Sequence, residues 1–396
     1  MISLQLDINK LEIRNRQNNY LKKLTEKKVD ASILFNTTNI FYLTGFHFRP
    51  SERPIAFITD TKQKTHLFVP RLEKEHAEEY AVIDNVHYYQ EYPGLMHPME
   101  HLKEVLQANN FENKIVGLDA SGYNSSKGYR GPNIANLLNF DREVYIKDMV
   151  ESMRYVKSQD EIELIKESAR WGNLAHTLLV KYTRLGKREI EIEGLATYEA
   201  TRSMFETLGN GYRPYGSPAH AFYRGQIGPH SAFPHSQNQN AEIKHGYNVV
   251  SQAAADVWGY KSELERTMFI LEVNKLQESF FQHMINVQDI AFNTIKPGIP
   301  ASRIEEEVQR YYQENNLNKY IRHHTGHNMG LLNHEAPFFD LGDHTILKPG
   351  MVFSVEPGLY VEGLGAFRHS DTIVITENGM EKITYYPRDL NSLIIG

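Results

Sequence analysis

The chain has 396 residues, which is enough for two domains of ordinary size. Its formal net charge of −6 argues against a nucleic-acid-binding protein, which needs a basic surface patch. The absence of cysteine excludes disulfides, zinc–thiolate sites and a cysteine nucleophile. We expect neither a secretory signal nor a membrane span, because no apolar segment follows Met1 and no apolar run approaches ~18 residues. A cytoplasmic protein is therefore predicted.

The first 150 or so residues alternate short apolar runs with charged segments, a pattern typical of an α/β domain. The charged segment 71–81 is an expected helix. The apolar runs are expected to be buried strands, and they lie at 31–36, 54–59, 66–70 and 114–119. We therefore predict an N-terminal α/β domain over residues 1–152.

A second domain is predicted over residues 153–396, because a helix-start signal follows the first domain directly. Ser158 and Glu161 have the spacing of a capping box, and apolar residues then recur at helical spacing. Ser302 and Glu305 have the same spacing and predict another helix start. Expected strands lie at 247–254, 266–272, 351–357 and 371–379, the last ending in an Asn-Gly turn signal. This mixture predicts an α+β domain.

Four polar clusters occupy strand ends and loops of the second domain. They read FPHS at 233–236, SELERT at 262–267, HHTGHNMGLLNHE at 323–335, and SVEPG with FRHSDT at 354–358 and 367–372. Their order and spacing resemble the peptidase M24 family, which includes methionine aminopeptidase, aminopeptidase P, prolidase and creatinase. VDASILFNTTNIFYLTGF at 29–46 resembles the N-terminal domain of the creatinase type. The resemblance implies an α/β creatinase-type N-terminal domain followed by an α+β "pita-bread" C-terminal domain.

The peptidases of this family bind two metal ions through Asp, Asp, His, Glu and Glu. The matching positions here are Gln252, Glu263, His327, Glu356 and Ser370. Two dications need carboxylates to balance them, and Gln252 and Ser370 replace two of the usual charged ligands with neutral groups. We expect no cofactor. The alternative is at most one divalent ion (Mn, Zn, Fe or Co) held by Glu263, His327 and Glu356.

The resemblance also implies catalytic and substrate-binding residues. His235, His323 and His334 match histidines that surround the metals in the peptidases, and His235 matches the proton-transfer histidine of metal-free creatinase. Glu265 and Glu356 match the glutamates that hold the guanidinium of creatinase's substrate. His235 would then act as general base and acid, because imidazole titrates near neutrality. His323 and His334 would orient substrate, and the two glutamates would bind a cationic group.

Structural roles compete with some of these functional ones. Glu265 precedes Arg266, so an internal ion pair between them is the alternative to substrate binding. His235 has the alternative of a structural histidine bonded to backbone. Arg53 is expected to reach a neighbouring subunit's active site in a homodimer, as the resemblance implies, and a surface arginine is its alternative.

These residues support three hypotheses for function. We predict a creatinase-like, metal-independent hydrolase that cleaves a C–N bond in a small amidine, guanidino or amide compound. The first alternative is an Xaa-Pro dipeptidase or aminopeptidase that uses a single metal. The second alternative is a non-catalytic pita-bread protein that binds a protein or peptide. The expected partners are a small-molecule or dipeptide substrate and a second copy of the chain, with no nucleic acid and no membrane.

Overall fold

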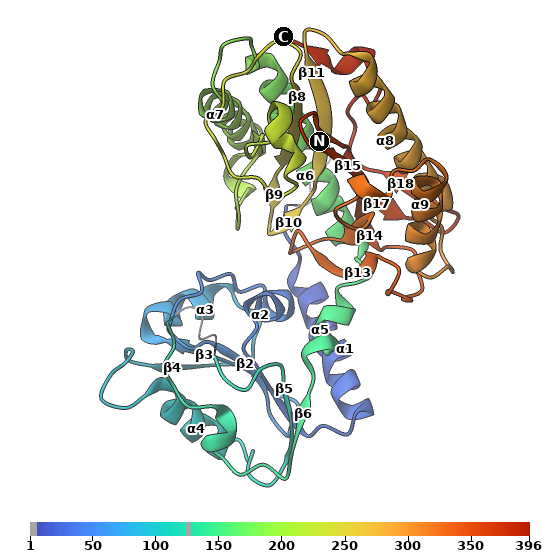
Figure 1. Ribbon diagram of the computed structural model, residues 1–396. Coiled ribbons are helices and arrows are strands. Elements are labelled where there is room, and N and C mark those ends of the chain that lie inside the picture. The colour runs from blue at the N-terminus through green and yellow to red at the C-terminus, as the bar shows by residue number, and fades with distance from the viewer. Residues whose placement is uncertain (1–5, 124–127) are drawn as a thin grey trace. The chain divides into compact units, whose positions relative to one another are not determined.

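The computed structural model describes residues 6–123 and 128–396 (Figure 1). The chain forms two compact units. One comprises Ile8–Met153, and the other comprises Arg154–Gly396 together with Leu6 and Asp7 from the start of the chain. Over the described ranges, no helix is both long enough and apolar enough to cross a membrane.

The N-terminal unit is built around a six-stranded sheet in the order β4-β3-β2-β1-β5-β6. Its strands are β1 (Ala31–Leu34), β2 (Ala56–Thr59), β3 (Thr65–Pro70), β4 (Asn85–Tyr89), β5 (Ile115–Leu118) and β6 (Arg142–Tyr145). Its α-helices are α1 (Lys10–Glu26), α2 (Thr37–Thr44), α3 (Lys74–Tyr80), α4 (Pro98–Ala108) and α5 (Lys147–Met153). Every residue of the central strands β1, β2 and β3 is buried, as their continuous apolar runs predict. The predicted α/β character is confirmed.

The C-terminal unit is built around a nine-stranded sheet. Seven strands follow the order β13-β12-β14-β17-β11-β8-β7, while β18 pairs with β17 and β19 pairs with β11. These strands are β7 (His220–Phe222), β8 (Asn248–Ala254), β11 (Leu264–Ile270), β12 (Gly326–Asn328), β13 (Glu335–Phe339), β14 (Val352–Val355), β17 (Ser370–Ile375), β18 (Met380–Lys382) and β19 (Ile394–Ile395). Two short hairpins pair β9 (Asp256–Val257) with β10 (Tyr260–Lys261), and β15 (Gly358–Val361) with β16 (Gly365–Arg368).

Four α-helices accompany this sheet: α6 (Gln159–Tyr182), α7 (Glu189–Leu208), α8 (Lys275–Thr294) and α9 (Ser302–Glu314). They pack in pairs, α6 with α7 and α8 with α9 (Figure 1). Helix α6 packs against β8, and α8 contacts β14. The predicted α+β fold of the second domain is therefore confirmed, with its polar clusters at strand ends and in neighbouring loops.

The starts of α6 and α9 differ in how they are held. Ser158 and Glu161 form the predicted capping box at the start of α6. The second predicted capping box is wrong, because Ala301 is the N-cap of α9 and no side chain caps it. Glu305 instead accepts hydrogen bonds from the backbone N–H and the hydroxyl of Thr325, at 2.8 and 2.6 Å. A tertiary contact thus replaces the local one, and it anchors the loop that leads into β12.

Candidate active site

Neighbouring strands of the large sheet place polar residues from distant parts of the sequence in register. Glu265 on β11 lies opposite Gln252 on β8 and opposite Ser370 on β17. On the next strands, His327 of β12 lies opposite Ser354 of β14. Directly opposed residues project from the same face of a sheet, with Cβ atoms about 4.5–5.5 Å apart. The sheet register therefore gathers these polar side chains on one face.

Glu263, His327 and Glu356 form the metal-ligand cluster of this face. Each offers one ligand atom, and these atoms all lie within 4.8 Å of one another. Nε2 of the fully buried His327 faces Oε1 of Glu356 at 3.1 Å and makes no hydrogen bond of good geometry. An imidazole and two carboxylates are suitable ligands for a first-row dication, and a buried ring nitrogen without a hydrogen bond is a natural donor for one. The three residues therefore fit a divalent metal ion.

The charge state of the cluster supports the same fit. Burial alone would lower the pKa of His327, but the neighbouring Glu356 carboxylate outweighs burial and raises it to about 9. Burial opposes ionisation of Glu356, yet His327 and Arg368 hold its pKa well below the usual range. The space between Nε2 of His327 and the carboxylate of Glu356 therefore favours a positive charge, such as a proton or a metal cation.

Glu263 is held in place by two hydroxyl groups. Its Oε1 atom accepts hydrogen bonds from the Oγ atoms of Ser354 and Ser370, each at 2.7 Å. The two hydroxyl oxygens lie 2.6 Å apart. Ser370, which the sequence identifies as a replaced ligand, thus contacts a retained ligand and orients it.

Glu265 has an internal ion-pair partner, which is Arg368 and not the adjacent Arg266. Nη2 of Arg368 donates to Oε1 of Glu265 at 2.6 Å, and Nε of Arg368 contacts Oε2. The amide of Gln252 also donates to Oε1, at 2.5 Å. Both members of the ion pair are buried, while Arg266 pairs with Asp371 at 2.8 Å. Glu265 therefore forms an internal ion pair, as the alternative held, but the predicted partner Arg266 is wrong.

His323 belongs to a chain of hydrogen bonds that ends at this ion pair. Its Nε2 atom lies 2.7 Å from the hydroxyl of Tyr360, and Nη1 of Arg368 donates to the same hydroxyl at 3.0 Å. Nδ1 of His323 faces the backbone carbonyl of His324 at 2.8 Å, so Nδ1 carries the ring proton and Nε2 accepts from Tyr360. Burial lowers the pKa of His323, which keeps the ring neutral.

The other predicted site residues lie in three different settings. His334 is exposed, and its ring stacks on His327 with centroids 3.9 Å apart. His235 occupies an exposed turn after the 3-10 helix η5 (Gly228–Ala232), and its side chain makes no hydrogen bond with any described residue. Arg53, in the N-terminal unit, pairs with Glu52 and Glu91. The structure thus brings His334 to the cluster and leaves His235 outside the cluster's hydrogen-bond network, while Arg53 pairs with acidic residues of its own unit.

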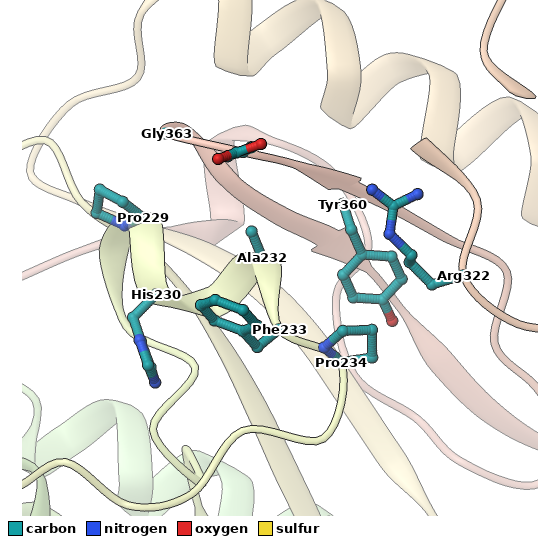
Figure 2. A pocket seen from close by; sticks show the side chains of 9 residues that line it. Pro229, His230, Ala232, Phe233, Pro234, Arg322, Tyr360 and Gly363 are labelled. Atoms are coloured by element: carbon teal, nitrogen blue, oxygen red, sulfur yellow. The ribbon is translucent and has the colours of Figure 1, made fainter. Parts of the chain in front are cut away.

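A cavity of about 720 Å³ lies next to Tyr360 (Figure 2). It is lined by Pro229, His230, Ala232, Phe233, Pro234, Arg322, Tyr360, Glu362 and Gly363. Figure 2 shows Pro229, His230 and Phe233 along one part of the wall, and Tyr360 and Arg322 along another. The Tyr360 hydroxyl connects this cavity to His323 and Arg368. Sequence reasoning missed both Tyr360 and Arg322, although Tyr360 stands two residues after the EPG motif.

Comparison with known proteins identifies the family to which the two-domain fold and this ligand cluster belong. Residues 163–377, more than half of the chain, match Metallopeptidase family M24. Residues 16–156 match the Creatinase/Prolidase N-terminal domain. The chain belongs to the M24 metallopeptidase family. The predicted family, fold and C–N hydrolase class are therefore confirmed.

Similar proteins cover almost the whole chain. The Xaa-Pro dipeptidase of Pyrococcus horikoshii is 28% identical over 389 residues, which are 94% of this chain and 99% of that protein. The Xaa-Pro dipeptidase of Pyrococcus furiosus is 26% identical, covering 96% of this chain and all of the relative. Among solved structures, the Xaa-Pro dipeptidase from Bacillus anthracis has a TM-score of 0.80 at 23% identity, covering 96% of this chain and 99% of its own.

Two predictions are corrected by these findings. The metal-independent, creatinase-like hydrolase is wrong, because the family is one of metallopeptidases and the full-length relatives are Xaa-Pro dipeptidases. The expectation of no cofactor is wrong for the same reason, and because Glu263, His327 and Glu356 still converge on one point. Gln252 and Ser370 remove two of the usual ligands, but Glu263, His327 and Glu356 are enough to hold a divalent ion.

Proposed function

We propose that this protein is a metal-dependent dipeptidase that hydrolyses Xaa-Pro dipeptides. The observation that carries the proposal is the convergence of Glu263, His327 and Glu356 within 4.8 Å. A divalent ion bound there supplies Lewis-acid activation of the peptide carbonyl and of water. The Xaa-Pro dipeptidases of two Pyrococcus species, which match the chain over nearly its full length, support the substrate class.

The surrounding side chains suit the binding of a small dipeptide. Pro229, Phe233 and Pro234 give the cavity beside Tyr360 an apolar wall, which fits a proline ring. Arg322 lies on another part of the wall, beside Tyr360, and offers a guanidinium for the terminal carboxylate. Tyr360 bridges this cavity and His323, so it can align the substrate with the ligand cluster.

His323 and His334 divide two further tasks in this proposal. His323 is neutral and buried, with its proton on Nδ1, so its fixed ring orients the Tyr360 hydroxyl. One face of the His334 ring stacks on His327 while the side chain stays accessible, and this partial burial together with the charge of His327 lowers its pKa. A neutral, accessible imidazole at this position is suited to exchange a proton with the departing amine. The roles of His235 and Arg53, the homodimer and the cytoplasmic location stay predictions.

The proposal is tested with the purified full-length chain, an Xaa-Pro dipeptide and a dipeptide of similar size without proline. We expect hydrolysis of the first, loss of activity in chelator, and recovery with added Mn²⁺. The variant His327→Ala should bind no metal and show no turnover. His324→Ala is the matched control and should keep both metal binding and turnover, because the side chain of His324 is not a metal ligand. Hydrolysis that survives complete metal removal contradicts the proposal.

A further inference from the structure

The chemistry of the second metal position differs from that of the first. The family resemblance implies two metal ions and five ligands, and the two missing ligands are Gln252 and Ser370. Both lie in register with Glu265, one on each side of it in the sheet. The two positions that lack a metal ligand are therefore neighbours in the sheet, and Glu265, which carries a carboxylate, lies between them.

That carboxylate is already committed to an internal cation. Arg368 contacts both oxygens of Glu265, and the amide of Gln252 donates to Oε1. Guanidinium does not release its proton in proteins, and the buried guanidinium of Arg368 lies against both oxygens of the buried Glu265. Ser370 meanwhile points its hydroxyl at Glu263. Gln252, Glu265 and Ser370 thus each have a partner within the protein.

The local charge leads to the same conclusion. A histidine that binds a metal ion is neutral, so with His327 as ligand and the three carboxylates counted as ionised, Glu263, Glu265 and Glu356 with the guanidinium of Arg368 give a net charge of −2. One dication cancels this charge. A second would leave a surplus of two positive charges in a largely buried region, where unbalanced charge is costly.

We propose that the site binds one divalent ion, and that the guanidinium of Arg368, held by Glu265, takes the place of the second. This inference rests on the proposed function only in assuming an ion at Glu263, His327 and Glu356. It adds a stoichiometry and assigns a role to Glu265: its carboxylate secures the internal cation beside the metal.

The direct test counts bound ions. The chelator-treated full-length protein is titrated with Mn²⁺ by isothermal calorimetry, and the loaded protein is analysed for metal by mass spectrometry. We expect one ion per chain. Two ions per chain would overturn the inference and leave the proposed dipeptidase standing, whereas no binding at all would overturn both.

A conservative variant tests the role of Glu265. In Glu265→Gln the guanidinium of Arg368 loses its counter-charge next to the bound ion, so Mn²⁺ affinity should fall by about 10–100-fold. Glu189→Gln is the control, because Glu189 is equally buried but binds the backbone N–H groups of Gly225 and Gln239. Its Mn²⁺ affinity should match the unaltered protein. Equal affinity in both variants contradicts the assigned role.

A gain-of-binding variant tests whether charge sets the stoichiometry. Gln252→Asp combined with Ser370→Glu adds two carboxylates at the second position, which balance a second dication. The calorimetric ratio should rise from one to two Mn²⁺ per chain. Circular dichroism establishes that the double variant is folded, and a folded variant that still binds one ion would overturn the charge argument.

Discussion

Replacing Tyr360 by phenylalanine removes one hydroxyl group at the junction of the cavity and the site. That hydroxyl donates to Nε2 of His323 at 2.7 Å and accepts from Nη1 of Arg368 at 3.0 Å, and Tyr360 is 1% exposed. Water cannot readily replace a group buried so completely. The substitution therefore leaves one donor of a buried guanidinium without its acceptor, which costs about 1–3 kcal/mol of unfolding free energy.

The same change should weaken catalysis. Without the hydroxyl, Nε2 of His323 loses the hydrogen bond that fixes the ring. A small change in the orientation of such a group lowers the rate of catalysis by about 10–100-fold. We expect Tyr360→Phe to lower kcat/KM for an Xaa-Pro dipeptide by about that factor, which corresponds to about 1.4–2.7 kcal/mol. Urea denaturation and steady-state kinetics measure the two effects. Tyr385→Phe is the control, because Tyr385 is 68% exposed and should stay within about 0.5 kcal/mol. If Tyr360→Phe matched the unaltered protein in both assays, this account of the hydrogen-bond chain would be refuted.

Three further predictions concern stability and are measured by denaturant unfolding. Burial lowers the pKa of His176 to about 3. The unfolded chain therefore binds a proton that the folded protein does not, and the free energy of unfolding falls by up to about 1.4 kcal/mol per pH unit as the pH drops from 6.5 toward 3. His176→Gln should lose less unfolding free energy between pH 7 and 5. Arg266→Met should cost about 3–5 kcal/mol, because it removes the ion-pair partner that lies 2.8 Å from the buried carboxylate of Asp371, and a loss below 1 kcal/mol would contradict this. Ser158→Ala should cost about 1 kcal/mol through the lost helix cap, and a variant as stable as the unaltered protein would argue against the capping role.

The fold was largely predictable from local patterns. Continuous apolar runs identify the buried strands β1 to β3, and the Ser158 capping box identifies the start of α6. The Ser302 signal failed because the carboxylate of Glu305 is used by Thr325 across the fold. Sequence spacing does not show which of two possible partners a side chain will take.

The site was predictable in its residues but not in its contacts. Glu263, His327 and Glu356 were recognised as the surviving ligands, yet their convergence within 4.8 Å depends on strand register. The partner of Glu265 proved to be Arg368, which approaches from a different hairpin and not from the next residue. The prediction of metal independence was wrong because charges were counted along the sequence, whereas binding depends on where the ligand atoms meet.

The central claim is that Glu263, His327 and Glu356 hold a divalent ion that this chain needs to hydrolyse Xaa-Pro dipeptides. The most direct test measures hydrolysis of one such dipeptide with the same protein sample as purified, after exhaustive chelation, and after Mn²⁺ is restored. The account predicts that activity disappears with the metal and returns with it. Activity that is unchanged after chelation, or no activity in protein shown to carry the ion, would contradict it.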